Sequence, residues 1–375
     1  MFGELVTAYL FLAGVGAGGV AAASVADLLL VREPFGADVV PDFAEKCPAE
    51  RLVAGVLALS CGALALGAGC LAADLGRIDR VLSLFLTPPA TLMNLGAWAV
   101  ALLTVLAAAL ALARFLYLPW ADRRAVVVAE VVACGLAVVV AVYAGLLLQT
   151  LAGVRLWSTP WVPVLFVLSA ASCGCALLMA GALFAEGDEG VRKVAQAAAR
   201  ADAVVIVAEV AAAAGFLAFV AGSDHAGVQA SAASLLHGPA ALPWWVGFVT
   251  CGLAAPLAVE VGCLVWGRRR RGPGLGLNTG AAMCSPWAPV SGPRAYPAAA
   301  LALAAAFVLV GAVGLRAAVV EAGAQRPLEL QSVEGAPSAP SESMETAAFC
   351  SAPFAEGGGE NGAVPDREDV DLWSN

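Results

Sequence analysis

The side chains that most often hold redox cofactors are few in this chain and poorly placed for that work. Its only two histidines, His225 and His237, lie between long apolar segments rather than inside one. Haem held inside a membrane usually has paired axial ligands, most often histidine. None of the ten cysteines forms a Cys-x-x-Cys pair, and Cys173 and Cys175 would point to different sides of a helix. We therefore expect this chain to hold no haem, iron–sulfur cluster or other metal.

What remains for proton and hydrogen-bond chemistry is a small set of polar residues in apolar surroundings. Four acids lie near or within long apolar segments: Asp27, Glu130, Glu209 and Glu260. Six further polar residues lie close to the ends of such segments: Tyr9, Asp74, Arg77, Tyr143, Gln149 and Arg316. Such groups do chemistry only if helices bring them together, so the elements that carry them must be identified.

Composition assigns the chain to the membrane proteins, because 61% of its residues are hydrophobic, only 13% are charged and its mean hydropathy is +0.85. A helix needs roughly 20 apolar residues to cross a bilayer. Eight segments are long enough, and they lie near residues 5–31, 52–73, 90–113, 125–148, 161–185, 203–221, 244–266 and 298–320. The sequence predicts an all-α, polytopic membrane protein with eight transmembrane helices.

The first of these segments is too long and too poor in basic residues at its start for a signal peptide. Gly14 and Gly18 form a small-xxx-small pair in it, and Gly16 and Gly19 widen the same smooth face. Two interpretations stay open at this point. The glycines either let another helix pack closely or make room for a ligand.

Orientation follows from the basic residues, which are retained on the cytoplasmic side of a membrane. The loops after the odd-numbered segments hold fourteen Lys and Arg residues, whereas the even-numbered loops hold only Arg77, Arg80 and Arg155. Both termini are therefore predicted on the outer side. Beyond the membrane domain, residues 1–323, we expect residues 324–375 to form an acidic, disordered tail that could also bind a partner.

Five motifs occur in order at the ends of the predicted helices. They are YLFLAGVGAGG at 9–19, CLAADLGRIDRVLSLFLTPPATLMNLGAW at 70–98, VYAGLLLQ at 142–149, LWSTPWVPVLFVLSAASCGCAL at 156–177 and LVGAVGLRAAVVEAGAQ at 309–325. In this series the chain resembles the NrfD and polysulfide reductase membrane-subunit family, over residues 1–326. That family consists of eight-helix anchors of bacterial respiratory iron–sulfur oxidoreductases.

The resemblance implies a haem-free subunit of the bacterial inner membrane that binds menaquinone or ubiquinone as an exchangeable substrate. It also implies a four-cluster ferredoxin-like iron–sulfur partner subunit, commonly joined to a molybdopterin catalytic subunit. Membrane lipid is the remaining expected contact, and nucleic acid is not expected. Whether such a subunit counts as an enzyme is left open, because it is either quinone-reactive or a non-catalytic anchor.

Tyr143 matches a family tyrosine implicated in the quinone pocket, and it is the strongest single candidate. With the predicted orientation, Tyr9, Asp74, Arg77, Gln149 and Arg316 lie at the same outer level. Asp74 could pair with Arg77 or with Arg316, because an unpaired charge at membrane depth is costly. The alternative is that these are ordinary interfacial charges and that Tyr143 belongs to an aromatic belt.

The four acids are candidates for a proton path from the cytoplasmic side, with Glu209 expected to be the deepest. Snorkelling to the interface would equally explain Asp27, Glu130 and Glu260 and is favoured for them.

Two departures from the family pattern concern the pocket: Asn94 and Leu95 replace a frequent Ser-Trp pair, and the first segment has no histidine. A purely structural anchor, or a secondary transporter with helices broken at mid-membrane, remain the alternative functions.

Overall fold

The structure is a computed structural model of the 375-residue chain, and it describes residues 4–31, 48–76, 92–116, 123–150, 156–184, 188–223, 226–269 and 298–324. Every regular element in these ranges is helical. Eight helical stretches are long and apolar enough to cross a membrane, which confirms the predicted number of spans and the all-helical, multi-pass class. Ala324, where the tail was expected to begin, is still helical, and residues 325–375, Arg77 and Arg80 lie outside the described residues.

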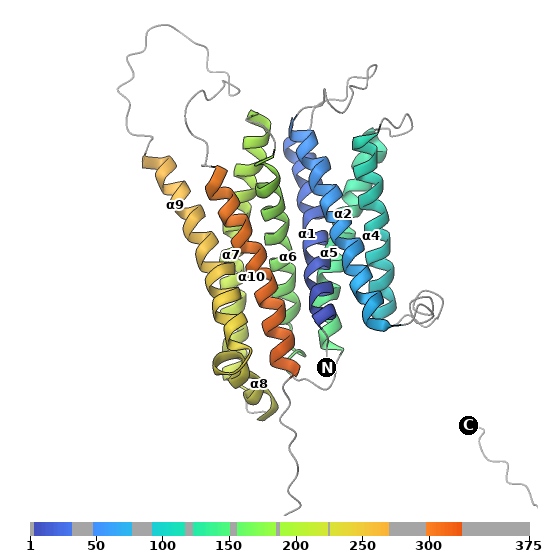
Figure 1. Cartoon of the computed structure of the whole chain (residues 1–375). Coiled ribbons are helices and arrows are strands. Elements are labelled where there is room, and N and C mark those ends of the chain that lie inside the picture. Colours follow the sequence, from blue (N-terminus) through green and yellow to red (C-terminus); the bar gives the residue numbers. More distant parts are fainter. Residues whose placement is uncertain are drawn as a thin grey trace, which may run out of the picture. The chain divides into compact units, whose positions relative to one another are not determined.

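The spans run alternately up and down through one bundle (Figure 1). Their elements are α1 (Glu4–Ala26) with η1 (Asp27–Val31), α2 (Pro48–Leu75), α4 (Leu92–Phe115), α5 (Arg123–Gln149), α6 (Trp161–Gly181), α7 (Glu189–Ala221), η3 (Pro243–Ala254) with α9 (Ala255–Arg269), and α10 (Ala298–Ala324). We call the end at which α1 begins the N-terminal end and the other the opposite end. Consequently α2, α5, α7 and α10 end at the N-terminal end, where α4, α6 and η3 begin.

The sixth span differs most from the sequence prediction, because α7 has 33 residues instead of the expected stretch over 203–221. Arg192, Lys193 and Arg200 lower the hydropathy of its first half, yet the helix continues through them. Its start is capped by Asp188, whose carboxylate accepts a hydrogen bond from the Gly190 N–H at 3.2 Å. Glu209 therefore lies deep within this helix rather than near its beginning.

Two further features of the seventh span and its approach were not predicted. A short helix, α8 (Ala226–His237), precedes that span at the N-terminal end. The span itself begins as the π-helix η3 and continues without a break into the α-helix α9. The described part of this span therefore lacks the mid-membrane break that a transporter of broken helices would have.

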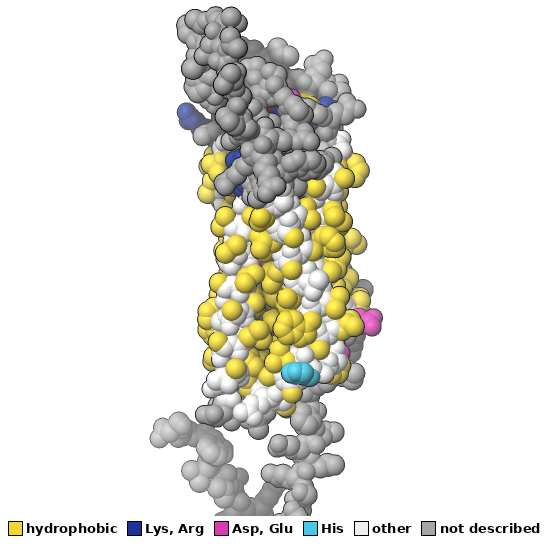
Figure 2. Space-filling view, turned by 90° about the vertical axis from the view of Figure 1, so that its left-hand side faces the viewer, with side chains coloured by type: hydrophobic (Ala, Val, Ile, Leu, Met, Phe, Trp, Pro, Cys, Tyr) yellow, Lys and Arg dark blue, Asp and Glu magenta, His cyan; other side chains and the backbone are white. Residues whose placement is uncertain are grey.

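The lipid-facing exterior is apolar. Figure 2 shows a face whose middle is covered by hydrophobic side chains, with Lys and Arg near one end. Exposed valines such as Val105, Val128 and Val204 belong to this kind of surface. A surface of this composition is stable in contact with hydrocarbon rather than water.

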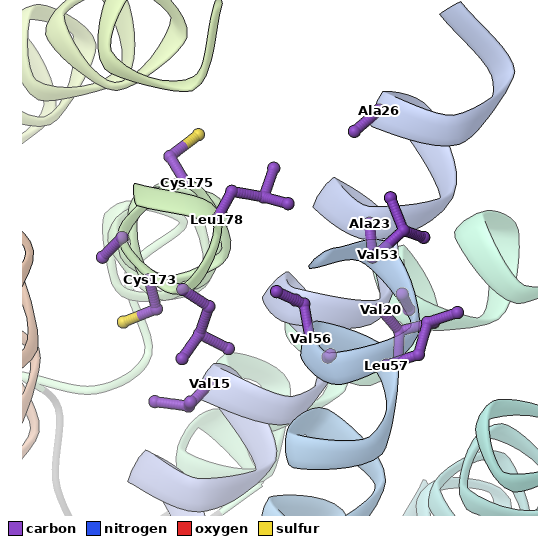
Figure 3. Packing of buried hydrophobic residues seen from close by; sticks show 14 of the residues in the cluster. Val15, Val20, Ala23, Ala26, Val53, Val56, Leu57, Cys173, Cys175 and Leu178 are labelled. Carbon is purple, nitrogen blue, oxygen red and sulfur yellow. The ribbon is translucent and has the colours of Figure 1, made fainter. Parts of the chain in front are cut away.

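The interior is filled by small and branched residues, several of which are shown in Figure 3. Val20 and Ala23 of α1 lie beside Val53 and Leu57 of α2. Cys173 and Cys175 point to different sides of α6, as predicted, and both thiols are free. These cysteines are therefore packing residues of two separate helix contacts.

The glycines of α1 allow neighbouring helices to approach its backbone. A β-carbon at Gly18 would collide with the Ala170 carbonyl of α6, and one at Gly16 would meet Leu64 and the Ser60 carbonyl of α2. Gly14 differs, because a β-carbon there would collide with the guanidinium of Arg316. Close helix packing therefore explains Gly16 and Gly18, and the space at Gly14 is filled by a side chain of the protein itself.

We predict that Gly18→Ala destabilises the bundle, because the new methyl group must push α1 away from the α6 backbone. Overpacking of this kind costs about 1–3 kcal/mol. Thermal unfolding of the purified protein in detergent measures the effect. Gly62→Ala in α2 is the matched control, since a β-carbon there meets no atom within 4 Å. Equal unfolding temperatures for the two variants would contradict the close α1–α6 contact.

Candidate functional site

Two of the predicted site residues meet inside the bundle toward its N-terminal end. The phenol groups of Tyr9 on α1 and Tyr143 on α5 are hydrogen-bonded to each other. Both side chains are buried. Gly96 of α4 lies against the Tyr143 ring, and a β-carbon at that position would collide with it. Tyr143 therefore lies between helices rather than in an aromatic belt at the membrane surface.

Arg316 of α10 is buried one turn deeper and binds the backbone beside this pair. Its Nε donates to the Leu10 carbonyl at 3.0 Å, and its Nη1 donates to the Ser169 hydroxyl at 3.1 Å and to the Ala312 carbonyl at 2.9 Å. The guanidinium also lies over the Phe166 ring, 5.3 Å from the ring centroid. Arg316 thus joins α1, α6 and α10, and it holds the carbonyl of the residue that follows Tyr9.

Of the two partners considered for Asp74, Arg316 does not pair with it. Asp74 is exposed in the last turn of α2, whereas Arg316 is only 1% exposed and donates to the groups named above. After Asp74 the chain turns at Gly76, whose φ of +67° favours glycine. The alternative partner, Arg77, lies outside the described residues.

Gln149 has a structural contact at the same end. Its side-chain amide donates to the Thr159 carbonyl at 2.6 Å and so connects the end of α5 to the segment before α6. In that segment Trp157 is buried, and its indole N–H donates to the Val319 carbonyl of α10 at 2.9 Å. Gln149 and Trp157 therefore fix the ends of the helices that carry Tyr143 and Arg316.

Toward the opposite end, Asp27 and Glu130 share one cation. Arg114 of α4 makes two hydrogen bonds to the Asp27 carboxylate, at 3.2 and 2.9 Å, and also pairs with Glu130 of α5. The Glu130 side chain is fully buried and that of Asp27 is 20% exposed. The snorkelling interpretation is wrong for Glu130, because its carboxylate reaches a buried arginine and not the interface.

Glu260 of α9 is also buried rather than snorkelling, and its partner is an acid that the sequence reasoning missed. It contacts Asp202 of α7, a residue just outside the predicted sixth span of 203–221. Asp202 is completely buried and accepts a hydrogen bond from the Ser172 hydroxyl of α6 at 2.5 Å. Glu209, buried on the same helix, interacts electrostatically with both Asp202 and Arg316.

A signal for Asp202 was present in the sequence. Asp202 and Glu209 are seven residues apart, a spacing that places two side chains on the same face of a helix. Ser169 and Ser172 have the equivalent three-residue spacing on α6. The pairing of these faces, and the choice of Arg114 as partner for Asp27 and Glu130, depend on which helices are neighbours.

Chemically, the arrangement offers hydrogen-bond donors at one level and acids at another. In a hydrogen bond between two phenols only one hydroxyl proton is used, so the Tyr9–Tyr143 pair retains one O–H for an outside acceptor. Asp202, Glu209 and Glu260 are proton acceptors in the interior. Among the described residues no group of His, Cys, Asp and Glu side chains comes together that could hold a metal ion.

We predict that Arg114→Gln strongly destabilises the protein, because it leaves Asp27 and Glu130 without their cation. Removing one partner of a buried ion pair costs about 3–5 kcal/mol. Thermal unfolding in detergent is the measurement, and Lys193→Gln, which removes an exposed pair with Glu189, should have little effect. Adding Asp27→Asn and Glu130→Gln to Arg114→Gln should recover part of the loss. No recovery would show that the charges are not what couples these helices.

In the comparison with protein families, residues 1–272 match the family described as "Polysulphide reductase, NrfD". The matched part contains α1 to α9 and nearly all of the candidate site, while α10 with Arg316 follows it. No curated protein matches the chain. Because the match covers more than half of the sequence, this eight-span membrane protein belongs to the NrfD family of polysulphide reductase membrane subunits, which partner the other subunits of oxidoreductase complexes.

Proposed function

We propose that this chain exchanges electrons between the membrane quinone pool and an extracytoplasmic iron–sulfur partner subunit. The reaction belongs at the N-terminal end of the bundle, which we propose faces outward. A menaquinone or ubiquinone is the exchangeable substrate, and the four-cluster ferredoxin-like partner, with a molybdopterin subunit behind it, belongs to the same proposal. The bacterial inner membrane is the expected location.

The Tyr9–Tyr143 pair is the observation that carries this proposal. A quinone is an apolar ring with two carbonyl oxygens, and a site for it needs hydrogen-bond donors within an apolar interior. The two tyrosines are buried side by side, and one of their hydroxyl groups can still donate a hydrogen bond to a ligand. These residues therefore fit a quinone carbonyl in their chemistry, and family membership supplies the redox context.

Arg316 supports this site as a positioning residue. Its hydrogen bond to the Leu10 carbonyl holds the turn of α1 that carries Tyr9. The Arg316 guanidinium also donates to Ser169 and lies over the Phe166 ring. Arg316 therefore supports the site without needing to contact the substrate. Asp74 is exposed at the same end of the bundle, which suits contact with a partner subunit better than contact with a buried ring.

Quinone chemistry moves protons as well as electrons, and Glu209 is the best candidate of the four predicted acids to supply them. It is buried, and it interacts electrostatically with both Asp202 and Arg316. Asp27 and Glu130, in contrast, are held by Arg114. We therefore keep Glu209 and Glu260 as proton-path candidates and give Asp27 and Glu130 a structural role.

Tyr143→Phe should lower the rate of quinol oxidation by the co-expressed complex about tenfold or more. The variant loses the hydroxyl that donates a hydrogen bond to the quinone, which raises the activation free energy. Membranes containing the full complex are assayed at matched amounts of assembled subunits. Thr104→Val is a matched control, since its hydroxyl donates only to the Val100 carbonyl of its own helix. It should leave turnover unchanged.

The same assay separates the proposal from the structural-anchor alternative. An anchor predicts that Tyr143→Phe and Tyr9→Phe reduce assembly while turnover per assembled complex stays at the wild-type value. Normal turnover in both variants would remove the phenol pair from the reaction. Glu209→Gln belongs in this series, where slower turnover with normal assembly would support its part in proton supply.

The outward orientation of both ends of the membrane domain has its own test. Alkaline phosphatase fused after Asn375 should be active, because it folds only outside the cytoplasm, and a fluorescent protein fused there should stay dark. The basis is the concentration of Lys and Arg in the odd-numbered loops. The same reporters inserted in the segment 32–47 should give the reverse pattern. Matching signals from the two positions would overturn the predicted topology.

A further inference from the structure

The contact between Asp202 and Glu260 places two carboxyl groups together in the interior of a membrane bundle. Asp202 comes from α7 and Glu260 from α9, and their side chains are hydrogen-bonded to each other. Asp202 is 0% exposed and Glu260 is 3% exposed. Glu260 is a proton-path candidate of the proposed function, whereas Asp202 has no part in it, and neither residue contacts the Tyr9–Tyr143 pair.

The hydrogen bond between these groups requires a proton, because two ionised carboxylates are acceptors only. Within the described part of the chain, Asp202 Oδ2 and both Glu260 oxygens receive no hydrogen bond from an N–H or hydroxyl donor. Asp202 Oδ1 is the exception and accepts from Ser172. The only hydrogen that can join the two groups is therefore one carried by a carboxyl.

The charges around the pair lead to the same requirement. Asp27 and Glu130 are also adjacent acids, yet Arg114 binds both of them. Arg316, a buried cation of α10, interacts with Glu209 and Cys173. No cation among the residues that the structure describes pairs with Asp202 or Glu260. Two ionised carboxylates in contact are then strongly unfavourable at low dielectric, and such pairs share one proton.

The groups that face the pair from the packed helices are few and are mostly acids or thiols. Ser172 and Cys175 approach from α6, and Glu209 lies two turns along α7 from Asp202. Cys173 of α6 interacts electrostatically with Asp202, Glu209 and Arg316. The surroundings therefore stabilise a neutral or singly charged pair rather than a doubly charged one.

We propose that Asp202 and Glu260 form a proton-binding site in which one proton is shared between the two carboxyl groups. Glu260 carries the proton and donates it to Asp202, whose negative charge is stabilised by the Ser172 hydroxyl. Transfer within the pair breaks the O–H bond at Glu260 and forms one at Asp202, so the total charge stays at one negative. The site does not depend on quinone reactivity of the chain.

Infrared spectra of the purified full-length chain in detergent test this directly. A protonated carboxyl has a carboxylic acid C=O band that moves when H₂O is replaced by D₂O, and an ionised carboxylate lacks this band. We expect Asp202→Asn and Glu260→Gln each to remove one such band, because the new amide donates to the remaining carboxylate and replaces the shared proton. The double variant should remove no more intensity than either single variant.

Several results would overturn the proposal. If the double variant removed twice the intensity of the single variants, each carboxyl would hold its own proton. If no variant changed the band, both groups would be ionised. Glu189→Gln is the control for an exposed acid, which pairs with Lys193 at 3.2 Å, and it should leave the band unchanged at neutral pH.

A further variant keeps the test valid if the amide substitutions prevent folding. Ser172→Ala retains both carboxyls and removes only the hydroxyl that orients Asp202. We expect the band to persist at a shifted frequency, and an unshifted spectrum would contradict the proposed site. Since these measurements need neither quinone nor partner subunit, their outcome is independent of the Tyr143→Phe experiment.

Discussion

A buried arginine in an apolar bundle is the constraint on which the N-terminal half of this structure depends. A guanidinium at membrane depth must have its donors satisfied by the protein, because lipid offers no acceptor. Arg316 meets this demand with the Leu10 and Ala312 carbonyls and the Ser169 hydroxyl. The absence of a side chain at Gly14 provides the space. The hydrogen bonds that Arg316 requires therefore determine how closely α1, α6 and α10 approach one another. Because Tyr9 precedes Leu10 on α1, they also determine the position of Tyr9.

Polar groups are consequently graded along the interior instead of being scattered in it. Phenols lie toward the N-terminal end, Arg316 lies one step deeper, and Glu209 connects it electrostatically to Asp202. Lipid-facing positions on the same helices are apolar (Figure 2). A helix can combine both surfaces because its apolar side faces hydrocarbon while a narrow polar stripe faces the other helices. Polar side chains therefore follow one another from the proposed quinone site to the proposed proton-binding site, but they do not form an unbroken row of charges.

The spans and the pairing of charges differ in how well sequence predicts them. Hydropathy locates the eight spans well, because length and apolarity are imposed by the bilayer itself. It fails for the first half of α7, where Arg200 and Asp202 interrupt the apolar run although the helix continues. Tyr9 and Tyr143 were predicted to share a level and are in contact, whereas Arg316, one of the two partners considered for Asp74, does not pair with it. Partners depend on helix neighbours and rotation, which one-dimensional periodicity does not contain.

The two acid pairs of this chain show why burial alone does not identify a proton site. Asp27 and Glu130 lie beside Arg114, whose positive charge offsets theirs and which binds both, so that cluster acts as a clamp between helices. Asp202 and Glu260 have a serine hydroxyl and each other. Their stable state requires a proton, which can leave and return, unlike an arginine. Among the described residues, the two acid pairs therefore differ in what balances their charge: Arg114 does so at Asp27 and Glu130, and a shared proton does so in our proposal for Asp202 and Glu260.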